Sequence, residues 1–176
     1  PRIDGLDKSK YLTYEDAVDL NRPPKSLVII GGGAVGCEFA QLFAIFGTKV
    51  YLIETGSRLL KKEAREAGEF QKERFESEYT VSVHTSTRVE KVEIFGGKKR
   101  LIVKNMKSGS LVRITVDEIL IATGKKATLD IGLENAGVKT NANLIATNGY
   151  MQTTTENIFA AGDCVGPYQF THMAIY

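Results

Sequence analysis

The sequence contains few of the residues that build metal sites, disulfide scaffolds or membrane spans. Its 176 residues include two cysteines, Cys37 and Cys164, and two histidines. Two distant cysteines exclude a disulfide scaffold and are typical of a reducing, cytoplasmic compartment. Two scattered histidines without a cysteine cluster do not support a metal site. The apolar runs are too short for a helix that spans a bilayer.

The sequence also has no marked excess of positive or negative charge, because 23 basic and 21 acidic residues leave a net charge of +2. This balance gives no electrostatic argument for nucleic acid or for an anionic membrane surface as a partner. With 43% hydrophobic and 25% charged residues, the composition is that of a globular protein. The sequence begins without Met and ends inside an apparent helical pattern, so we expect it to be part of a longer chain.

Residues 26–54 have the pattern of a strand, a helix and a second strand. Residues 26–31 form a short apolar run that is rich in β-branched residues, which is typical of a strand buried on both faces. A helix follows, because apolar residues recur at helical spacing as one stripe and Gly47 can end it; the stripe consists of Val35, Phe39, Leu42, Phe43 and Phe46. Residues 50–54 form the second strand, and a right-handed crossover places the two strands in parallel.

The remaining elements complete an α/β fold class. An exposed amphipathic helix is predicted over 61–78, with a weak apolar face of Ala64, Ala67, Phe70 and Phe75 and mixed-sign pairs elsewhere. Alternating runs predict a third strand at 80–84 and an antiparallel meander, and a buried run at 118–122 predicts a final strand; the meander runs are 88–95, 100–104 and 111–117. We therefore expect a Rossmann-like βαβ unit with a parallel sheet plus an antiparallel β-meander.

The two ends of the chain have a different character. Residues 1–25 are polar and end in paired prolines, so we predict an extended lead-in. Residues 26–124 contain all the predicted strands of the main unit. Residues 125–176 are turn-rich up to 157, with a short helical candidate at 131–136 and a strand and tight turn at 157–163.

The most informative motif is G-x-G-x-x-G at Gly31, Gly33 and Gly36, with Ala34 and Val35 between them. Its position between a predicted strand and a predicted helix is the context that gives it meaning. The first glycine makes the tight turn, the second lets a pyrophosphate approach the backbone, and the third lets the helix pack on the strand. The N-terminus of the helix offers unpaired N–H groups to phosphate. The alternative is a glycine turn without a ligand.

The coenzyme preference depends on Glu54, which closes the second strand 18 residues after Gly36. A carboxylate here can accept hydrogen bonds from the adenosine ribose and would repel a 2′-phosphate. The sequence therefore favours NAD(H) over NADP(H). Arg58 lies close enough to Glu54 to keep NADP(H) open.

Three segments together resemble the flavoprotein disulfide reductases, a family of pyridine nucleotide oxidoreductases; they are 31–38, 121–124 and 158–163. The lead-in 1–7 and residues 132–138 are also similar to this family, so the resemblance covers nearly the whole chain. The stretch 170–174 is most similar to the branch of mercuric reductase and dihydrolipoamide dehydrogenase. The resemblance implies an NAD(H)-binding domain over 26–124 and a partial central or FAD-domain segment over 125–176.

The resemblance also implies roles for individual residues. The glycine loop would bind the NAD(H) pyrophosphate, Glu54 the adenosine ribose, and Glu38 would lie near the nicotinamide, although a helix-surface acid is an equal alternative. Val89 and Gly124 would line the adenine and nicotinamide sides of the cleft. Asp163 would hydrogen-bond the ribityl chain of FAD, and the backbone of His172 would contact the flavin.

Several parts of the family's complete subunit have no counterpart in the sequence. There is no closely spaced cysteine pair and no match to the family's acid/base His, so no residue of this chain is predicted to be catalytic. Cys37 is interpreted as a small packing residue and Cys164 as structural. His84 is expected at a strand end.

We therefore expect an inactive piece of an FAD-dependent NAD(H):disulfide or mercuric ion oxidoreductase, in which hydride passes from NAD(P)H to flavin in the intact enzyme. Its partners would be the dinucleotide, the rest of its own subunit and, in the intact enzyme, a second copy. Two alternatives stay open: an NADH dehydrogenase or oxidase without a redox dithiol, and a non-catalytic NAD(H)-sensing module. The sequence leaves the electron acceptor open.

Overall fold

The computed structural model describes residues 1–79, 81–124 and 127–166. The chain divides into two compact units, 1–124 and 125–176. Each unit is described by itself. Among the described residues, no helix is both long enough and apolar enough to cross a membrane.

The first unit is built on a four-stranded parallel sheet in the order β3-β2-β1-β7. Its strands are Ser26–Ile30 (β1), Lys49–Ile53 (β2), Val81–His84 (β3) and Glu118–Ile121 (β7). Helices Ala34–Ile45 (α2) and Arg65–Glu78 (α3) provide the crossovers. This confirms the predicted βαβ unit with a parallel sheet.

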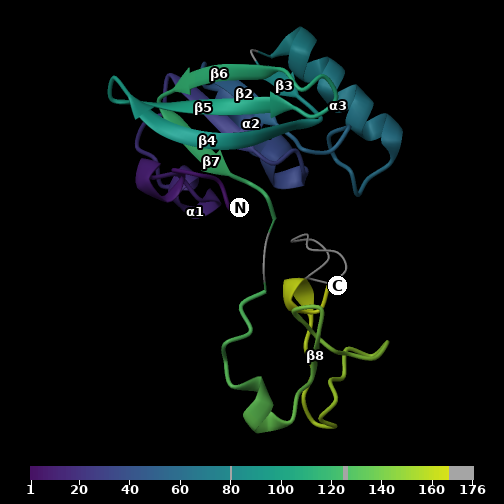
Figure 1. The fold of residues 1–176 in the computed structure, drawn as a ribbon. Helices are drawn as coiled ribbons and strands as arrows, with labels where there is room; N and C mark the ends of the chain where they lie inside the picture. The colour runs from purple at the N-terminus through teal and green to yellow at the C-terminus, as the bar shows by residue number, and fades with distance from the viewer. Residues whose placement is uncertain (80, 125–126, 167–176) are drawn as a thin grey trace. The chain divides into compact units, whose positions relative to one another are not determined.

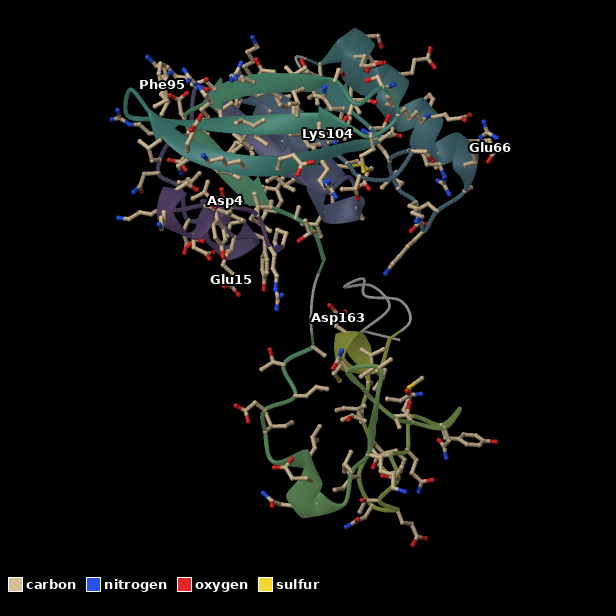
Figure 2. All side chains as sticks on the ribbon, in the orientation of Figure 1. Asp4, Glu15, Glu66, Phe95, Lys104 and Asp163 are labelled. Atoms are coloured by element: carbon tan, nitrogen blue, oxygen red, sulfur yellow. The ribbon has the colours of Figure 1, made fainter. Side chains whose placement is uncertain are left out.

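A three-stranded antiparallel meander is the second layer of strands, in the order β4-β5-β6. It comprises Thr87–Phe95 (β4), Lys98–Asn105 (β5) and Leu111–Val116 (β6). Figure 1 shows the meander over the parallel sheet, with α2 beyond that sheet. Phe95 and Lys104 mark opposite ends of the meander in Figure 2. The fold class predicted from the sequence, an α/β unit with an added antiparallel meander, is confirmed.

The parallel sheet is buried on both faces, which explains the unbroken apolar run of β1. Leu27 and Ile29 pack in one core with residues of α2 and α3, including Phe43 and Phe75. Val28 and Ile30 point to the other face and pack in a second core with residues of the meander. Strand side chains alternate between faces, so the part of a strand that lies between two layers is apolar on both faces.

Helix α2 does not bury the whole stripe that its sequence suggests. Its buried residues are Gly36, Cys37, Ala40 and Phe43. Leu42 and Phe46 of the predicted stripe are instead exposed. The reason is the close approach of the helix to β1, since only small side chains fit along most of that face.

The predicted extended lead-in is wrong for residues 1–25. The segment contains a 3₁₀ turn, Asp7–Ser9 (η1), and a short helix, Tyr14–Val18 (α1). A reciprocal capping box starts α1, because the Thr13 side chain accepts from the Asp16 N–H and the Asp16 carboxylate accepts from the Thr13 N–H. Buried apolar residues in this polar-looking segment hold it on the unit, as Leu6 is 2% exposed.

The lead-in also covers an edge of the parallel sheet. The N–H of Leu12 donates to the carbonyl of Ile119 at 2.7 Å, and the N–H of Ile121 donates to the carbonyl of Leu12 at 2.9 Å. These bonds pair Leu12 with the outer side of β7. An uncovered edge strand would present a row of unpaired backbone groups, so the lead-in protects this edge.

Helix α3 begins at Arg65 and is largely exposed, as predicted. Three i,i+4 ion pairs run along it, and they join Arg65 to Glu69, Lys72 to Glu76, and Arg74 to Glu78. Its buried residues are Gly68 and Phe75. The predicted apolar face is therefore correct only for Phe75, whereas Phe70 is 60% exposed.

The second unit consists mainly of turns. The helical candidate at 131–136 is a 3₁₀ turn, Leu133–Ala136 (η2), between two left-handed glycines. A small hairpin pairs Thr140–Asn141 (β8) with Leu144–Ile145 (β9). A second 3₁₀ turn, Gly162–Cys164 (η3), follows an isolated bridge between Gln152 and Phe159.

Candidate nucleotide-binding site

The glycine loop connects the end of β1 to α2. Gly31 has φ +117°, and a Cβ at this position would lie 2.4 Å from the carbonyl oxygen of Ala122 on the neighbouring strand end. A Cβ at Gly36 would lie 1.9 Å from the carbonyl oxygen of Gly31. Both positions therefore require glycine, the first for its backbone conformation and for the close approach of Ala122, the second for the packing of the helix on the turn.

The middle glycine of the motif has the opposite surroundings. Gly33 is exposed, and a Cβ added to it would meet no atom within 4 Å. Nothing in the fold of the described residues requires glycine here. Open space over a backbone position at the start of a helix is what a bound diphosphate needs, because its oxygens must approach the backbone closely.

The start of α2 offers hydrogen-bond donors to that space. Gly33 is the N-cap, and no side chain caps the helix. The backbone N–H groups of the first turn, from Ala34 to Gly36, have no partner inside the helix by geometry. Together with the helix dipole they favour an anion in front of Gly33.

The strand order puts this loop at a topological switch point. The chain leaves β1 through α2 toward β2, while β7 lies on the other side of β1. Ligands in open α/β sheets bind at the carboxyl ends of the strands where the winding direction changes. Here these ends carry the glycine loop, Glu54 after β2, and 122–124 after β7.

The Glu54 carboxylate is hydrogen-bonded to the glycine loop. Its Oε2 accepts from the N–H of Gly32 at 2.7 Å, and its Oε1 accepts from the N–H of Gly56 at 2.5 Å. A carboxylate has about four acceptor positions, so capacity for hydroxyl groups of a ligand remains. These two bonds hold a negative charge at the carboxyl end of β2, which is where the sequence predicts a ribose ligand.

Gly32 is a structural residue of the site that the motif does not reveal. A Cβ at this position would lie 2.6 Å from Cδ2 of Leu59 and 2.9 Å from Cβ of Glu54. Its carbonyl accepts from the N–H of Leu60 at 2.8 Å. The G-x-G-x-x-G pattern leaves this position open, whereas packing against the turn after β2 requires a residue without a side chain. In the sequence, the run of three consecutive glycines at 31–33 is the feature that could have indicated this role of Gly32.

The other predicted residues lie in varied surroundings. Gly124 is exposed with φ +133°, just after β7, and Glu38 is exposed on α2. Val89 is 6% exposed and its side chain packs in the core between sheet and meander, so only its backbone could face a ligand. Asp163 lies half-buried in η3 of the second unit. His172 lies outside the described residues.

His84 ends β3, as expected, and stacks on Tyr51 with 6.3 Å between ring centroids. Burial lowers the pKa of His84 below its usual value, so the ring is neutral near pH 7. Its carbonyl accepts from the N–H of Glu54 at 2.9 Å. The residue thus has a structural role next to the site.

Cys37 is buried on the sheet-facing side of α2, and its Sγ lies 3.7 Å from the carbonyl oxygen of Gly32. Burial, with a smaller effect of Glu54 and Glu38, raises the pKa of the Cys37 thiol to about 12. Cys164 lies half-buried in the second unit, and its Sγ donates to the carbonyl of Ala161 at 3.2 Å. Cys37 therefore packs as a small apolar residue, as predicted.

We expect the two thiols to react at very different rates. Because the pKa of Cys37 is about 12, its thiolate fraction at pH 8 is about 10⁻⁴. Titration of the native protein with a disulfide reagent at pH 8 should modify Cys164 first, and Cys37 only after addition of denaturant. Mass spectrometry of the modified peptides identifies each site, and a Cys164→Ser variant should show no fast phase. Rapid native modification of Cys37 would contradict its burial.

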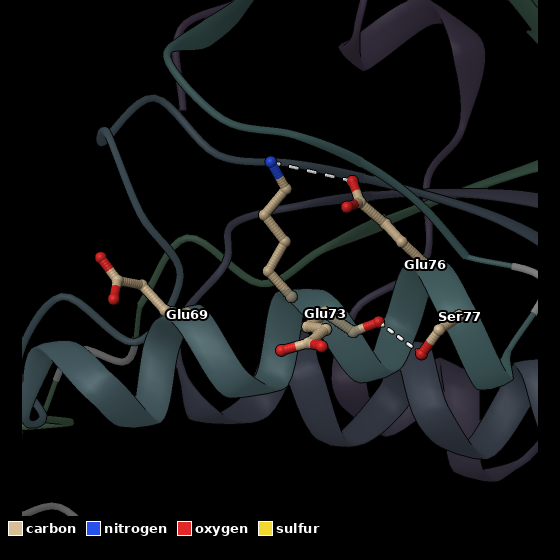
Figure 3. A pocket seen from close by; sticks show the side chains of 5 residues that line it. Glu69, Glu73, Glu76 and Ser77 are labelled. Carbon is tan, nitrogen blue, oxygen red and sulfur yellow. Dashed lines mark hydrogen bonds and ion pairs between the residues drawn. The ribbon is translucent and has the colours of Figure 1, made fainter.

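A separate hollow of about 430 Å³ lies along α3 and is lined by Glu69, Lys72, Glu73, Glu76 and Ser77. Figure 3 shows Glu69, Glu73, Glu76 and Ser77 of its lining along one helix. The Nζ of Lys72 lies 3.8 Å from Oε1 of Glu76. Its carboxylates would repel a diphosphate, and its one lysine is paired with Glu76. The hollow is not a candidate for the nucleotide.

Comparison with known proteins identifies the family of the chain. The family model described as pyridine nucleotide-disulphide oxidoreductase matches residues 1–176. The chain belongs to this family. It is 39% identical over 173 residues to a dihydrolipoyl dehydrogenase of Bacillus subtilis, and this match covers 97% of the chain and 36% of the relative. It is 38% identical over 178 residues to a mercuric reductase of Lysinibacillus sphaericus, and this match covers 100% of the chain and 32% of the relative.

A solved structure has the same fold. The HOCl-induced flavoprotein disulfide reductase RclA from Escherichia coli matches with a TM-score of 0.86 and 29% identity, and the match covers 99% of this chain and 39% of RclA. The chain thus spans about a third of the length of the relatives it matches. These relatives are oxidoreductases, and the predicted family is confirmed.

Proposed function

We propose that residues 1–124 bind NAD(H) at the carboxyl ends of β1 and β2. One observation carries the proposal: open space at Gly33 and the uncapped start of α2 lie next to a carboxylate, Glu54, that is hydrogen-bonded to the same loop. The loop N–H groups would hold the diphosphate. Glu54 would accept from ribose hydroxyls of the adenosine.

In the intact protein, we infer, this unit presents the coenzyme to a flavin. Bound nicotinamide would supply a hydride to FAD, and the electrons would then reach an acceptor through groups outside this chain. The share of residues 1–124 in that work is to bind and orient the coenzyme. Gly124 would border its nicotinamide end, and Asp163 in the second unit would contact FAD. We also propose that the intact protein is a dimer of two such subunits.

The proposal predicts measurable and selective binding. NADH should bind the purified chain with a dissociation constant between micromolar and millimolar, more tightly than NADPH, because a 2′-phosphate would face the Glu54 carboxylate. Glu54→Gln should weaken NADH binding about tenfold, the loss expected for one hydrogen bond to a charged group. The same variant should reduce the preference for NADH over NADPH, because the repulsion is removed.

Isothermal titration calorimetry with both coenzymes measures these values. Glu66→Gln is a matched control, because Glu66 is an exposed acid on α3 and projects from that helix in Figure 2. It should leave both affinities unchanged. If the wild-type chain bound neither coenzyme at millimolar concentration, or preferred NADPH, the proposed function would be wrong. Binding without any turnover after the remaining subunit is supplied would favour the sensing module instead.

A further inference from the structure

The guanidinium group of Arg58 lies inside the turn that follows Glu54. Its Nη1 donates to the carbonyl of Leu60 at 2.9 Å, and its Nη2 donates to the carbonyls of Lys61 and Glu63, both at 2.9 Å. Longer contacts of 3.4 Å reach the carbonyls of Leu59 and Ala64. The planar, five-donor fork of arginine suits such a cluster of carbonyls, and lysine has no equivalent geometry.

The turn that Arg58 holds is joined to the glycine loop. The N–H of Leu60 donates to the carbonyl of Gly32 at 2.8 Å, and the fully buried Leu59 side chain packs over the same glycine. On the other side of the turn, the carbonyl of Gly56 accepts from the N–H of Ser86 at 2.7 Å. Segment 55–64 is therefore joined both to the Gly32 backbone, through Leu60, and to the Glu54 carboxylate, through the N–H of Gly56.

The backbone conformation of segment 55–64 is unfavourable at one position and needs a stabilising contact. Leu60 has φ +49°, a left-handed value that is unfavourable for a side chain of this type. Arg58 lies close to the start of α3, where a helix dipole disfavours a cation. The hydrogen bonds to the carbonyls thus stabilise the guanidinium cation near the start of α3. In return, the cation stabilises a turn whose carbonyl oxygens converge on it.

We propose that Arg58 is a positioning residue that makes the site selective for a dinucleotide with a free 2′-hydroxyl. The inference rests on the proposed function. A 2′-phosphate could recruit Arg58 only by removing it from the carbonyls of Leu60, Lys61 and Glu63. The Leu60 carbonyl would keep the N–H of Glu63 as a donor, but the turn that carries Leu60 against Gly32 would lose the support of the guanidinium group. In its place inside the turn, Arg58 holds the loop that supports Glu54, and Glu54 repels the 2′-phosphate.

Two variants separate this role from that of a phosphate ligand. Arg58→Lys keeps the charge without the fork, and Arg58→Met keeps most of the length without the charge. Arg65→Met is the control, because Arg65 is exposed and pairs with Glu69 on α3. Hydrogen exchange of the ligand-free protein reports the Leu60 N–H, and calorimetry reports the affinities for NADH and NADPH.

Both Arg58 variants should accelerate exchange of the Leu60 N–H at least about tenfold, since the turn loses one or more hydrogen bonds from a charged donor. Both should weaken NADH binding several-fold without a selective loss of NADPH, and the control should change nothing. Selective loss of NADPH binding in Arg58→Met, with retention in Arg58→Lys and unchanged exchange, would overturn the proposal.

The same data distinguish the two hypotheses. A wild-type chain that binds neither coenzyme would overturn the proposed function and the selectivity with it. Unchanged Leu60 exchange in both Arg58 variants, with intact NADH binding, would overturn only the positioning role.

Discussion

Gly36→Ala should destabilise the first unit by roughly 3 kcal/mol or more, because overpacking against an immovable backbone atom is among the most costly single substitutions. The added Cβ would lie 1.9 Å from the carbonyl oxygen of Gly31. That oxygen belongs to the tight turn after β1, so it cannot move without opening the turn or lifting α2 from the sheet. A domain of ordinary stability would lose a large part of its free energy of unfolding.

Urea denaturation followed by far-ultraviolet circular dichroism measures this loss. Gly33→Ala is the matched control, because the same methyl group three residues earlier meets no atom within 4 Å. It should cost about 1 kcal/mol at most, the usual penalty for alanine at an N-cap. Similar midpoints for the Gly36→Ala variant and the wild-type protein would show that α2 does not pack on the turn as described.

The strands were predictable because the sheet leaves a strong pattern in the sequence. β1 lies between two cores, so its four buried positions, 27–30, are all apolar. The meander alternates because one face packs on the sheet and the other faces solvent. In both elements the hydrophobic period is set directly by the layers around the strand.

Helix α2 shows where periodicity fails. The stripe through Leu42 and Phe46 follows helical spacing, yet these side chains are exposed, and the buried face carries Gly36, Cys37 and Ala40. Hydrophobic size marks the buried face only when the neighbouring element leaves room for large side chains. Where backbones approach closely, the small residues mark it, and an apolar scale gives them little weight.

The sequence did not predict the structure of the lead-in or the hairpin of the second unit, and the two reasons differ. Leu6 and Leu12 are isolated apolar residues in a polar segment. Leu6 is buried and Leu12 half-buried through contacts with residues far along the chain. The hairpin between β8 and β9 turns through Ala142 and Asn143, which have φ +49° and +63°. That turn lacks the glycine that usually indicates it.

In the site, the motif identified residues by their spacing but not by their contacts. Gly31, Gly36 and Glu54 have the surroundings expected from the strand–helix–strand pattern. Gly32 and Arg58 were assigned no structural role, since Arg58 is held by main-chain carbonyls that leave no trace in side-chain identity. The sequence shows that Arg58 follows Glu54, but only the fold shows whether the guanidinium group is available to a ligand or is bonded to the protein itself.

Gly33→Val should abolish most NADH binding and leave the fold intact. The backbone of Gly33 has φ −77° and ψ −174°, an extended conformation that valine adopts readily. Its side chain would enter the open space over the loop, where the proposed diphosphate must approach the backbone. We expect the dissociation constant for NADH to rise by about 30- to 150-fold, equivalent to roughly 2–3 kcal/mol.

Calorimetric titration of a graded series tests this expectation, because the smaller Gly33→Ala should give an intermediate loss of affinity. Gly149→Val is a control in the second unit, where an added Cβ also meets no atom within 4 Å and φ is not left-handed. It should keep the wild-type affinity. Circular dichroism and the unfolding midpoint of each variant show that the fold is retained. If Gly33→Val bound NADH as tightly as the wild-type chain, the diphosphate would not lie on this loop. Gly33 would then be only an exposed N-cap residue, and the coenzyme would have to be sought elsewhere on the unit.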